Sequence, residues 1–428
     1  VDLGHGHHQH EGLPRPFDNG VMQGSNTAAD YVIRVIDNPS ELDMSAWRDL
    51  LSLQAEPTVF MDPAFLAALD ASGSATVDTG WSPCFLTVWR GHELHAACAL
   101  YLKSHSYGEY VFDWAWADAY GRAGLDYYPK LLSAVPFTPV PGTRLLARSG
   151  QARRALAHAL TDLVKAQGLS SAHVLFIDPQ EALILEEAGW MIRRGVQFHW
   201  EQDAAQPMDD FPSLLARMHR DKRKKIQQEM RRVRDAGVTF EALQGTQIEP
   251  RHWDYFHDCY TLTYRLHRST PYLNRDFFTR MARDMSGNWL LFIARIDAEP
   301  VGCSLVALDP VRRVAYGRYW GSTRHIPCLH FDACYYQPLA WCLTHGYRRF
   351  EGGAQGEHKM ARGLMPVATQ SAHWIADSRF ARAVDDFLQR EGAHVGAYVD
   401  ELREHSPFKP PSGPSNSSDA SGPSEVPG

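Results

Sequence analysis

Hydrophobic and polar residues follow one another along the chain in patterns that predict alternating strands and helices. The segment 31–37 predicts a strand and 45–55 a helix. A second helix is predicted over 62–73, because Asp62 stands before a proline at the first helical position. Two strands around Gly91 are expected within 84–105, and a further strand over 110–120. The pattern then predicts a helix, a strand, a helix and a strand over 151–168, 171–177, 181–190 and 191–201.

The same order of elements returns about 205 residues later. Residues 270–285 resemble 58–73, which places Phe278 on Phe65. The strand–turn–strand pattern recurs over 289–308, and 315–322 stands where 111–118 stood. The pair Tyr335–Tyr336 falls on Tyr127–Tyr128. These landmarks predict a duplicated α/β unit.

Composition narrows the class of protein. Hydrophobic residues make up 44% of the 428 residues and charged residues 22%, which is typical of a folded globular chain. The formal charge of −7 argues against a polycation that coats nucleic acid. The sequence has neither an apolar run long enough for a membrane helix nor the pattern of a secretion signal. The seven cysteines include no CxxC pair and are expected to be buried thiols, so we expect a cytoplasmic protein.

The two ends of the chain differ from the rest. Residues 1–30 are rich in Gly, His and Asn, and residues 406–428 in Pro, Ser and Gly, so both are predicted to be disordered tails. Four histidines among the first ten residues could bind a divalent metal, but we favour an unpacked tail and predict no metal site.

A strongly basic segment joins the two predicted halves. Residues 217–234 carry nine Lys or Arg against Asp221 and Glu229, and the segment up to Gly237 is expected to form one helix. Two interpretations stay open: the cations form a solvated face, or the helix from Arg217 to Arg234 contacts phosphates of tRNA or of anionic lipid.

Four segments resemble a known family: GAQGEHKMARGLMP (353–366), TQSAHWIAD (369–377), YLKSHSYGEYVFDWAWADAY (101–120) and HFDACYYQ (330–337). They are similar to the FemAB-like "peptidoglycan biosynthesis/recognition" proteins of bacteria, within the GNAT acyltransferase superfamily. The resemblance implies a mixed α/β fold of two tandem GNAT-like domains joined by the basic helix. It places the first domain at 31–203 and the second, with the basic helix, at 204–405. It also places Lys359 on the family's lysine and Gly363 on its glycine.

The resemblance implies transfer of an acyl or aminoacyl group from a donor to an amine. GNAT proteins hold donor phosphates with a Gly-rich loop at a helix N-terminus. The corresponding segment 321–333 has Arg324 and His325 but no pair of glycines, and 120–126 keeps only a fragment of such a loop. We therefore expect Arg324 and His325 to contact a co-substrate that is acyl-CoA or aminoacyl-tRNA, with no tightly bound cofactor.

The densest cluster of chemical groups is the segment from Glu351 to Gly363, where two cations, a base and an acid stand between glycines. Glu351, Glu357 and His358 compete for the role of general base. Lys359, Gln355 and Arg362 are expected to bind substrate, Lys359 being the preferred cation for a phosphate or carboxylate.

Two further groups of residues are expected to bind substrate. Arg318, Tyr319 and Trp320 lie on a central strand, and with Tyr336 they could line an acyl or glycan groove, although aromatic residues on strands often belong to the core. In the first half, polar residues surround a strand turn and could face the acceptor; the alternative is a surface hairpin. This second set comprises Lys103, Ser104, His105, Glu109 and Asp113.

The sequence contains no GxSxG, HExxH or Walker motif, so we expect the amine to attack the acyl group directly. The predicted function is a GNAT-type N-acyltransferase whose amine acceptor is a small molecule or a cell-wall or lipid-linked precursor. The alternative is a non-catalytic module that recognises cell-wall or anionic ligands through the same cleft.

Overall fold

The computed structural model describes residues 21–23, 31–354 and 356–409. The strands of the first half are β1 (Val21–Gln23), β2 (Val32–Ile36), β3 (Trp81–Pro83), β4 (Phe85–Arg90), β5 (Glu93–Cys98), β6 (Tyr101–Lys103), β7 (Lys130–Ser133), β8 (Leu146–Ala147), β9 (Ser171–Ile177) and β10 (Met191–Glu201). Those of the second half are β11 (Thr239–Gln244), β12 (Trp289–Ile296), β13 (Glu299–Asp309), β14 (Val314–Ser322), β15 (Arg349–Ala354) and β16 (Met365–Ile375).

The helices cover both halves of the molecule. In the first half they are α1 (Met44–Ser52), α2 (Pro63–Ala71), α3 (Trp114–Arg122), α4 (Gly150–Gln167) and α5 (Pro179–Glu187). In the second half they are α6 (Phe211–Arg217), α7 (Arg220–Asp235), α8 (Pro250–Leu266), α9 (Arg275–Asp284), α10 (Leu329–Phe331), α11 (Gln337–Thr344) and α12 (Ser378–Glu404), with a π-helical turn Asp332–Tyr336 between α10 and α11. Asp62 caps α2 by accepting from the Ala64 amide, as the proline after it predicts.

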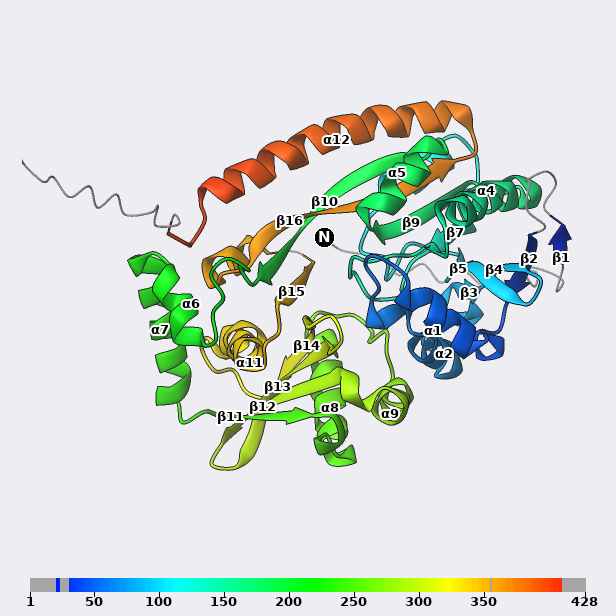
Figure 1. The fold of residues 1–428 in the computed structure, drawn as a ribbon. Helices are drawn as coiled ribbons and strands as arrows, with labels where there is room; N and C mark the ends of the chain where they lie inside the picture. Colours follow the sequence, from blue (N-terminus) through cyan, green and yellow to red (C-terminus); the bar gives the residue numbers. More distant parts are fainter. Residues whose placement is uncertain (1–20, 24–30, 355, 410–428) are drawn as a thin grey trace, which may run out of the picture.

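One 11-stranded sheet runs through both halves in the order β11-β12-β13-β14-β15-β10-β16-β9-β7-β6-β3. A 5-stranded sheet, in the order β1-β2-β4-β5-β8, belongs to the first half. In each half a parallel pair adjoins the antiparallel strands: β7 with β9, and β14 with β15. Figure 1 shows the long helix α12 crossing over β10 and β16.

The two halves exchange their last strands. Strand β10 of the first half lies between β15 and β16, and β16 of the second half lies between β10 and β9. Each half therefore completes its sheet with a strand of the other. Domain boundaries at 31–203 and 204–405 stay a prediction.

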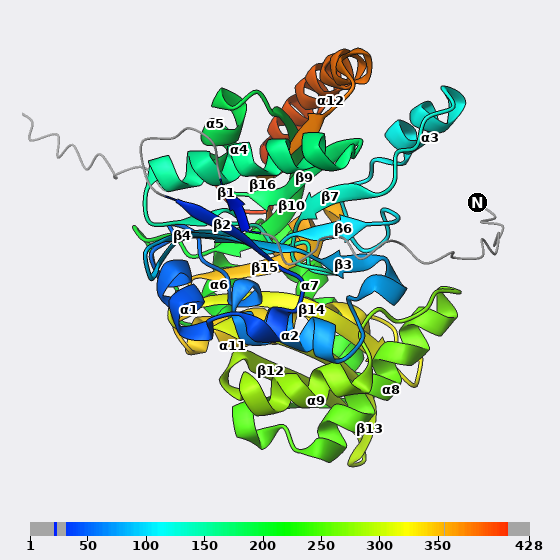
Figure 2. The ribbon, with the colours of Figure 1, turned by 90° about the vertical axis from the view of Figure 1, so that its right-hand side faces the viewer.

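The main hydrophobic core is also shared. The Phe65 ring of α2 contacts the Phe277 ring of α9 at 5.4 Å between centroids, and Phe60 contacts Tyr316 of β14 at 5.2 Å. Figure 2 shows α1 and α2 on the side of the first half that faces α8 and α9. Burial of these aromatic rings joins the halves along a broad apolar contact.

The strand expected over 110–120 is wrong: residues from Trp114 form the helix α3. The aromatic residues there alternate like those of a strand, but only Trp116 and Tyr120 are buried in α3. They are four residues apart, which is the spacing of one helix face. The segment 84–105 also differs from expectation, because it contains three strands, β4, β5 and β6.

The basic segment forms one helix, α7, as expected, but this helix begins at Arg220 and not at Arg217, because the chain leaves the helix between α6 and α7. Met218 is extended there and pairs with Phe408, and the His219 amide donates to the Pro407 carbonyl at 2.9 Å. Pairing with the C-terminal segment thus replaces helical hydrogen bonds at this point. Helix α7 does end before Gly237, whose φ of 79° is left-handed.

Two landmarks of the internal repeat do not correspond in structure. Tyr127 and Tyr128 precede the strand β7, whereas Tyr335 and Tyr336 belong to the π-helical turn. The segment 315–322 lies in strand β14, whereas 111–118 leads into α3. The repeated helix α2/α9 and the repeated strand pair β4–β5/β12–β13 are confirmed.

Among the described residues, no helix combines the length and the apolar character needed to cross a membrane. Five cysteines, at positions 84, 98, 259, 303 and 342, are buried free thiols, as expected. Cys328 and Cys334 are half-buried.

Candidate active site

A small cavity opens where β14 and β15 separate. Residues Val314–Tyr316 of β14 pair in parallel with Arg349–Glu351 of β15. Beyond these residues the two strands are not paired with each other. The cavity has a volume of about 160 Å³. Its lining includes Gly317, Arg318, Tyr319 and Trp320 of β14, Phe350 and Gly352 of β15, and His330, Cys334 and Tyr335.

The expected groove residues of β14 therefore lie together at this cavity. Arg318 is held there by a hydrogen bond of 2.9 Å from its Nη2 to the Phe137 carbonyl, across to the first half. Its guanidinium lies 5.2 Å from the centre of the Tyr319 ring. A cation beside aromatic faces in a partly buried cleft can bind a carboxylate, a phosphate or a polarised carbonyl.

A larger cavity of about 630 Å³ lies between the halves, and we call it the central cavity. Its floor is formed by β10 and β16 and its walls by α12 and the loop 110–112. Gly195 of β10 helps to keep it open, because a Cβ there would lie 2.9 Å from the Thr369 hydroxyl. Arg193, Ser371 and Glu391 supply polar groups to its lining.

Three of the four segments that carry the family resemblance reach the central cavity, and the segment 369–377 does so through Thr369, Gln370 and Ser371. Gly356 and Glu357 come from the segment 351–363, and Tyr110, Val111 and Phe112 from the segment 101–120. The Glu357 carboxylate is exposed and accepts a hydrogen bond from the Tyr398 hydroxyl of α12. Of the three expected bases, Glu357 is the one that lines this cavity.

Glu351 and Lys359 are buried and bonded within the protein. Glu351 forms an ion pair with Arg349 at 3.1 Å, and burial raises its pKa to about 7. The Lys359 ammonium donates to the carbonyls of Gly352 and Gly353 at 2.6 and 3.1 Å, and burial lowers its pKa to about 8. Lys359 thereby fixes the end of β15 beside the small cavity.

Arg362, Tyr336 and His358 gather around the basic helix. Arg362 Nη2 lies 3.2 Å from both Glu229 oxygens, and the Tyr336 hydroxyl donates to the same carboxylate. The Tyr335 hydroxyl lies 3.3 Å from His358 Nε2, and burial lowers the pKa of His358. The lining of neither cavity includes any of the three, so this cluster anchors the segment 351–363 to α7.

Arg324 and His325 are exposed in the turn between β14 and α10. Their assignment to the donor stays a prediction. Gln355 and the His-rich N-terminus lie outside the described residues.

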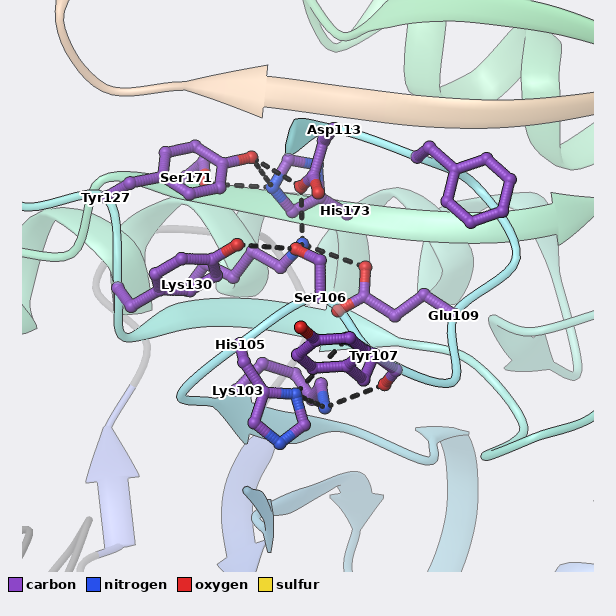
Figure 3. Close-up of polar contacts among 12 residues, drawn as sticks. Lys103, His105, Ser106, Tyr107, Glu109, Asp113, Tyr127, Lys130, Ser171 and His173 are labelled. Atoms are coloured by element: carbon purple, nitrogen blue, oxygen red, sulfur yellow. Dashed lines mark hydrogen bonds and ion pairs between the residues drawn. The ribbon is translucent and has the colours of Figure 1, made fainter. Parts of the chain in front are cut away.

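The polar residues of the first half form a buried network (Figure 3). The Lys130 ammonium donates to Ser106 Oγ and Glu109 Oε2, both at 2.8 Å, and to Asp113. The Tyr127 hydroxyl donates to Asp113 Oδ2 at 2.6 Å. Asp113 is therefore buried among charged groups. Its burial excludes the alternative that these polar residues belong to a surface hairpin.

Lys103 and His105 lie next to this network. The Lys103 ammonium is 3.4 Å from His105 Nδ1 and sits 3.8 Å from the centre of the Trp81 ring. Burial lowers the pKa of Lys103 to about 7 and that of His105 to about 4. Burial likewise raises the pKa of Glu109 to about 7, so the cluster contains groups that titrate near neutrality.

The profile of the FemAB-like family, described as peptidoglycan biosynthesis/recognition, matches residues 38–410. The chain belongs to the FemAB-like family. Comparison with curated proteins found no match.

Solved structures support the same fold. FemX is 11% identical, with a TM-score of 0.51 over 81% of this chain and 99% of FemX. The C-terminal domain of a protein assigned as a lysylphosphatidylglycerol synthetase, from Agrobacterium fabrum, is 10% identical, with a TM-score of 0.51 over 82% of this chain and 96% of that domain. A tandem GNAT protein from the clavulanic acid pathway matches with a TM-score of 0.43, at 14% identity, over 81% and 99% of the two chains. The fold is the expected mixed α/β fold, and it is similar to that of FemX and of the synthetase domain.

This FemAB-like chain also contains a pair of buried histidines that was not predicted from the sequence. His173 and His373 lie on β9 and β16, and their Nδ1 atoms are 2.8 Å apart. A signal was present: the tripeptide Ser-Ala-His occurs at 171–173 and again at 371–373. Lys130, Arg193 and Tyr398 were likewise not predicted as site residues, because no motif marks them.

Among the described residues, no cluster of three or more His, Cys, Asp or Glu side chains is arranged to hold a metal ion. The polar groups at the two cavities are instead hydrogen-bond donors, carboxylates and guanidinium groups, which suit organic acyl and amine groups.

Proposed function

We propose that this FemAB-like protein is an N-acyltransferase that binds its amine acceptor in the central cavity and the acyl end of its donor in the small cavity. The observation that carries the proposal is the meeting of Glu357 and the loop 110–112 at one cavity between the halves. Family membership supports an acyl- or aminoacyl-transferase. It also favours an acceptor amine on a peptidoglycan or lipid-linked precursor.

In the proposed reaction the amine attacks the acyl carbonyl directly. Cys334 lines the small cavity, but burial raises the pKa of its thiol, so it stays protonated and is a poor nucleophile. In this proposal Arg318, which lines the small cavity, stabilises the oxyanion that forms on the carbonyl. Glu357 takes a proton from the attacking nitrogen and returns it to the leaving group, so it ends the cycle ionised.

One further proton must leave the site. An acceptor that enters as an ammonium yields an amide, a protonated leaving group and one released proton. The proton on Glu357 is returned within the cycle, so the released proton needs another path.

The experiment is a survey of donors with the purified full chain. Acyl-CoA and aminoacyl-tRNA carrying radiolabelled acyl groups would be offered with peptidoglycan-precursor and lipid-linked amines, and labelled amide product measured. Labelled amide with any pair supports the proposal. Binding of a precursor without product from any donor would favour the alternative, a recognition module, which the missing glycine pair at 321–333 supports.

Filling the central cavity should block the acceptor. In Gly195→Leu the new side chain would enter the cavity lining, and we expect the KM for the acceptor to rise about 10-fold or more, as for an overpacked site. The matched control is the double variant Gly195→Ala/Thr369→Ala, which removes the close Thr369 hydroxyl and leaves the cavity open. An unchanged KM in the leucine variant would place the acceptor elsewhere.

Substitutions in the basic helix α7 can distinguish aminoacyl-tRNA from acyl-CoA as the donor. Its exposed cations include Lys224, Lys225, Arg231 and Arg232, and none of these four forms an ion pair with another described residue. Replacing all four with glutamine should reduce the salt slope of aminoacyl-tRNA binding by about 0.7–0.9 for each phosphate that the helix no longer neutralises.

Binding would be measured by filter retention between about 50 and 200 mM salt. The control neutralises four exposed arginines of α12 or its end: Arg379, Arg382, Arg390 and Arg403. If the parent and the α7 variant show the same salt slope, α7 does not contact tRNA phosphates. Its cations then form a solvated face, and this result favours acyl-CoA as the donor.

A further inference from the structure

A continuous series of hydrogen bonds connects the central cavity with the buried carboxylates of the first half. It starts at Ser371, whose Oγ lies 3.1 Å from His373 Nε2, and Ser371 lines the central cavity. The Nδ1 atoms of His373 and His173 are 2.8 Å apart. His173 Nε2 is 3.2 Å from the Tyr127 hydroxyl, which donates to Asp113 at 2.6 Å.

The carboxylate end sets the direction of the hydrogen bonds. Asp113 is ionised because the charge and the hydrogen bond of Lys130 outweigh the effect of burial and lower its pKa, so Tyr127 must donate to it. His173 Nε2 faces the Tyr127 hydroxyl at 3.2 Å and the Ser171 hydroxyl at 2.8 Å. In the relay this nitrogen carries the proton and donates to these hydroxyls, so His173 Nδ1 is the acceptor for a proton on His373 Nδ1. His373 Nε2 in turn accepts from Ser371, so every donor in the series points toward Asp113.

The two histidines can pass a proton without storing it. Burial lowers the pKa of His173 to about 3 and places that of His373 well below its usual value. The charged groups that face the pair are Arg193 and Lys130, which disfavour an imidazolium, and Asp113, which favours one. Trp116 of α3 stacks on His173 and contacts His373 edge-on, so the pair is enclosed.

We propose that this series is a proton relay that removes the proton released by the acceptor amine in the central cavity. The inference rests on the proposed acyl transfer, which supplies that proton. One proton enters at Ser371 Oγ as the serine proton passes to His373. Each following group receives one proton and gives one up, and the last proton arrives on Asp113.

Lys130 extends the relay to Glu109. The ammonium first gives one of its protons to Glu109, to which it is bonded at 2.8 Å, and the neutral amine so formed then takes the proton from Asp113. Glu109 has a pKa of about 7 because of its burial, so it can hold a proton at neutral pH. The relay protons arrive on Asp113 Oδ2 and Glu109 Oε2, the oxygens bonded to Tyr127 and Lys130, while the buried Oδ1 and Oε1 of the two carboxylates have no hydrogen-bond partner among the described residues.

The first test needs no substrate. Long-range ¹H–¹⁵N NMR of the ¹⁵N-histidine-labelled full chain reads which ring nitrogen carries the proton. We expect the Nε2–H form for His173, the Nδ1–H form for His373, and no titration of either between pH 5 and 9. The reverse pair of tautomers, or a charged histidine in this range, overturns the relay.

The second test uses the donor and acceptor found in the survey. Tyr127→Phe and Ser371→Ala should each lower kcat about 10-fold with little change in KM, and added imidazole should restore the rate because it takes the proton directly. The control is Tyr120→Phe: its ring lies 5.2 Å from that of Tyr127, and its buried hydroxyl has no hydrogen-bond partner among the described residues. It should behave like the parent with and without imidazole.

The outcomes separate the two proposals. Relay variants with the parent's kcat, or with a loss that imidazole does not relieve, overturn the relay while the acyltransferase stands. A parent that transfers no acyl group to any acceptor refutes the proposed function, and with it the source of the proton.

Discussion

Replacing Lys130 with methionine is expected to lower the free energy of unfolding by about 3–5 kcal/mol at pH 8, as for other buried ion pairs that lose one partner. Lys130 has 0% exposure, and it is bonded to two carboxylates that are themselves buried. The variant leaves Glu109 and Asp113 without their counter-ion in a site that water does not reach. Urea unfolding followed by circular dichroism would measure the loss.

The loss should shrink as the pH is lowered from 8 to 5. The pKa of Glu109 in the fold, about 7, lies above its ordinary value of 4.5, so the native state binds the extra proton in this window and gains stability as the pH falls. Without Lys130 the carboxylates should take up protons at still higher pH. A loss that does not vary with pH would show that the charges are not its cause.

Lys103→Met is the matched control, because Lys103 is also fully buried in the same part of the fold. Its pKa in the fold is lowered to about 7 from 10.5, so the unfolded chain binds more protons between these values. Stability therefore rises with pH across that window, and at pH 8 the lysine opposes folding. The methionine variant should be at least as stable as the parent at pH 8.

The second large effect is expected on turnover. Glu357→Gln should lower kcat about 1,000-fold, because the amide cannot take the proton from the attacking nitrogen. The melting temperature should stay within a few degrees, since the side chain is exposed. Single-turnover transfer of a labelled acyl group would measure the rate.

Glu401→Gln, which changes a nearby exposed carboxylate that does not line the central cavity, should leave kcat unchanged. Full activity of Glu357→Gln would remove Glu357 from the chemistry. If both variants lose the same factor in kcat, the effect comes from the negative charge of the acidic residues as a group and not from a proton transfer by Glu357.

Local patterns predicted most of the fold. Features that depend on neighbouring residues in the sequence could be predicted from it. Examples are the N-cap at Asp62, the glycine after α7 and the apolar strands β9 and β12. A strand was predicted in place of helix α3 because the aromatic residues there alternate along the sequence. The residues that pack against α3 in the core, such as Phe380, are distant in the sequence. The break before α7 depends on residues 407–408, about 190 positions away, which no local pattern reports.

The candidate site was predicted only in part, for the same reason. Glu357, Arg318 and Asp113 stand in motifs crowded with polar groups, and the structure brings them to cavities or to the buried network. Lys130 and the histidine pair owe their roles to partners on other strands. A lysine that follows two tyrosines and a proline in the sequence gives no sign of the two carboxylates around it.

The exchange of final strands has a consequence for how the protein is made. When the ribosome has completed the first half, β10 and one edge of β9 still lack their neighbours, because β15 and β16 belong to residues 349–375. The nascent chain must carry these open sheet edges until almost the whole polypeptide has been synthesised. Open edges invite pairing with other chains, so the growing polypeptide passes through a stage at which a chaperone would be of use.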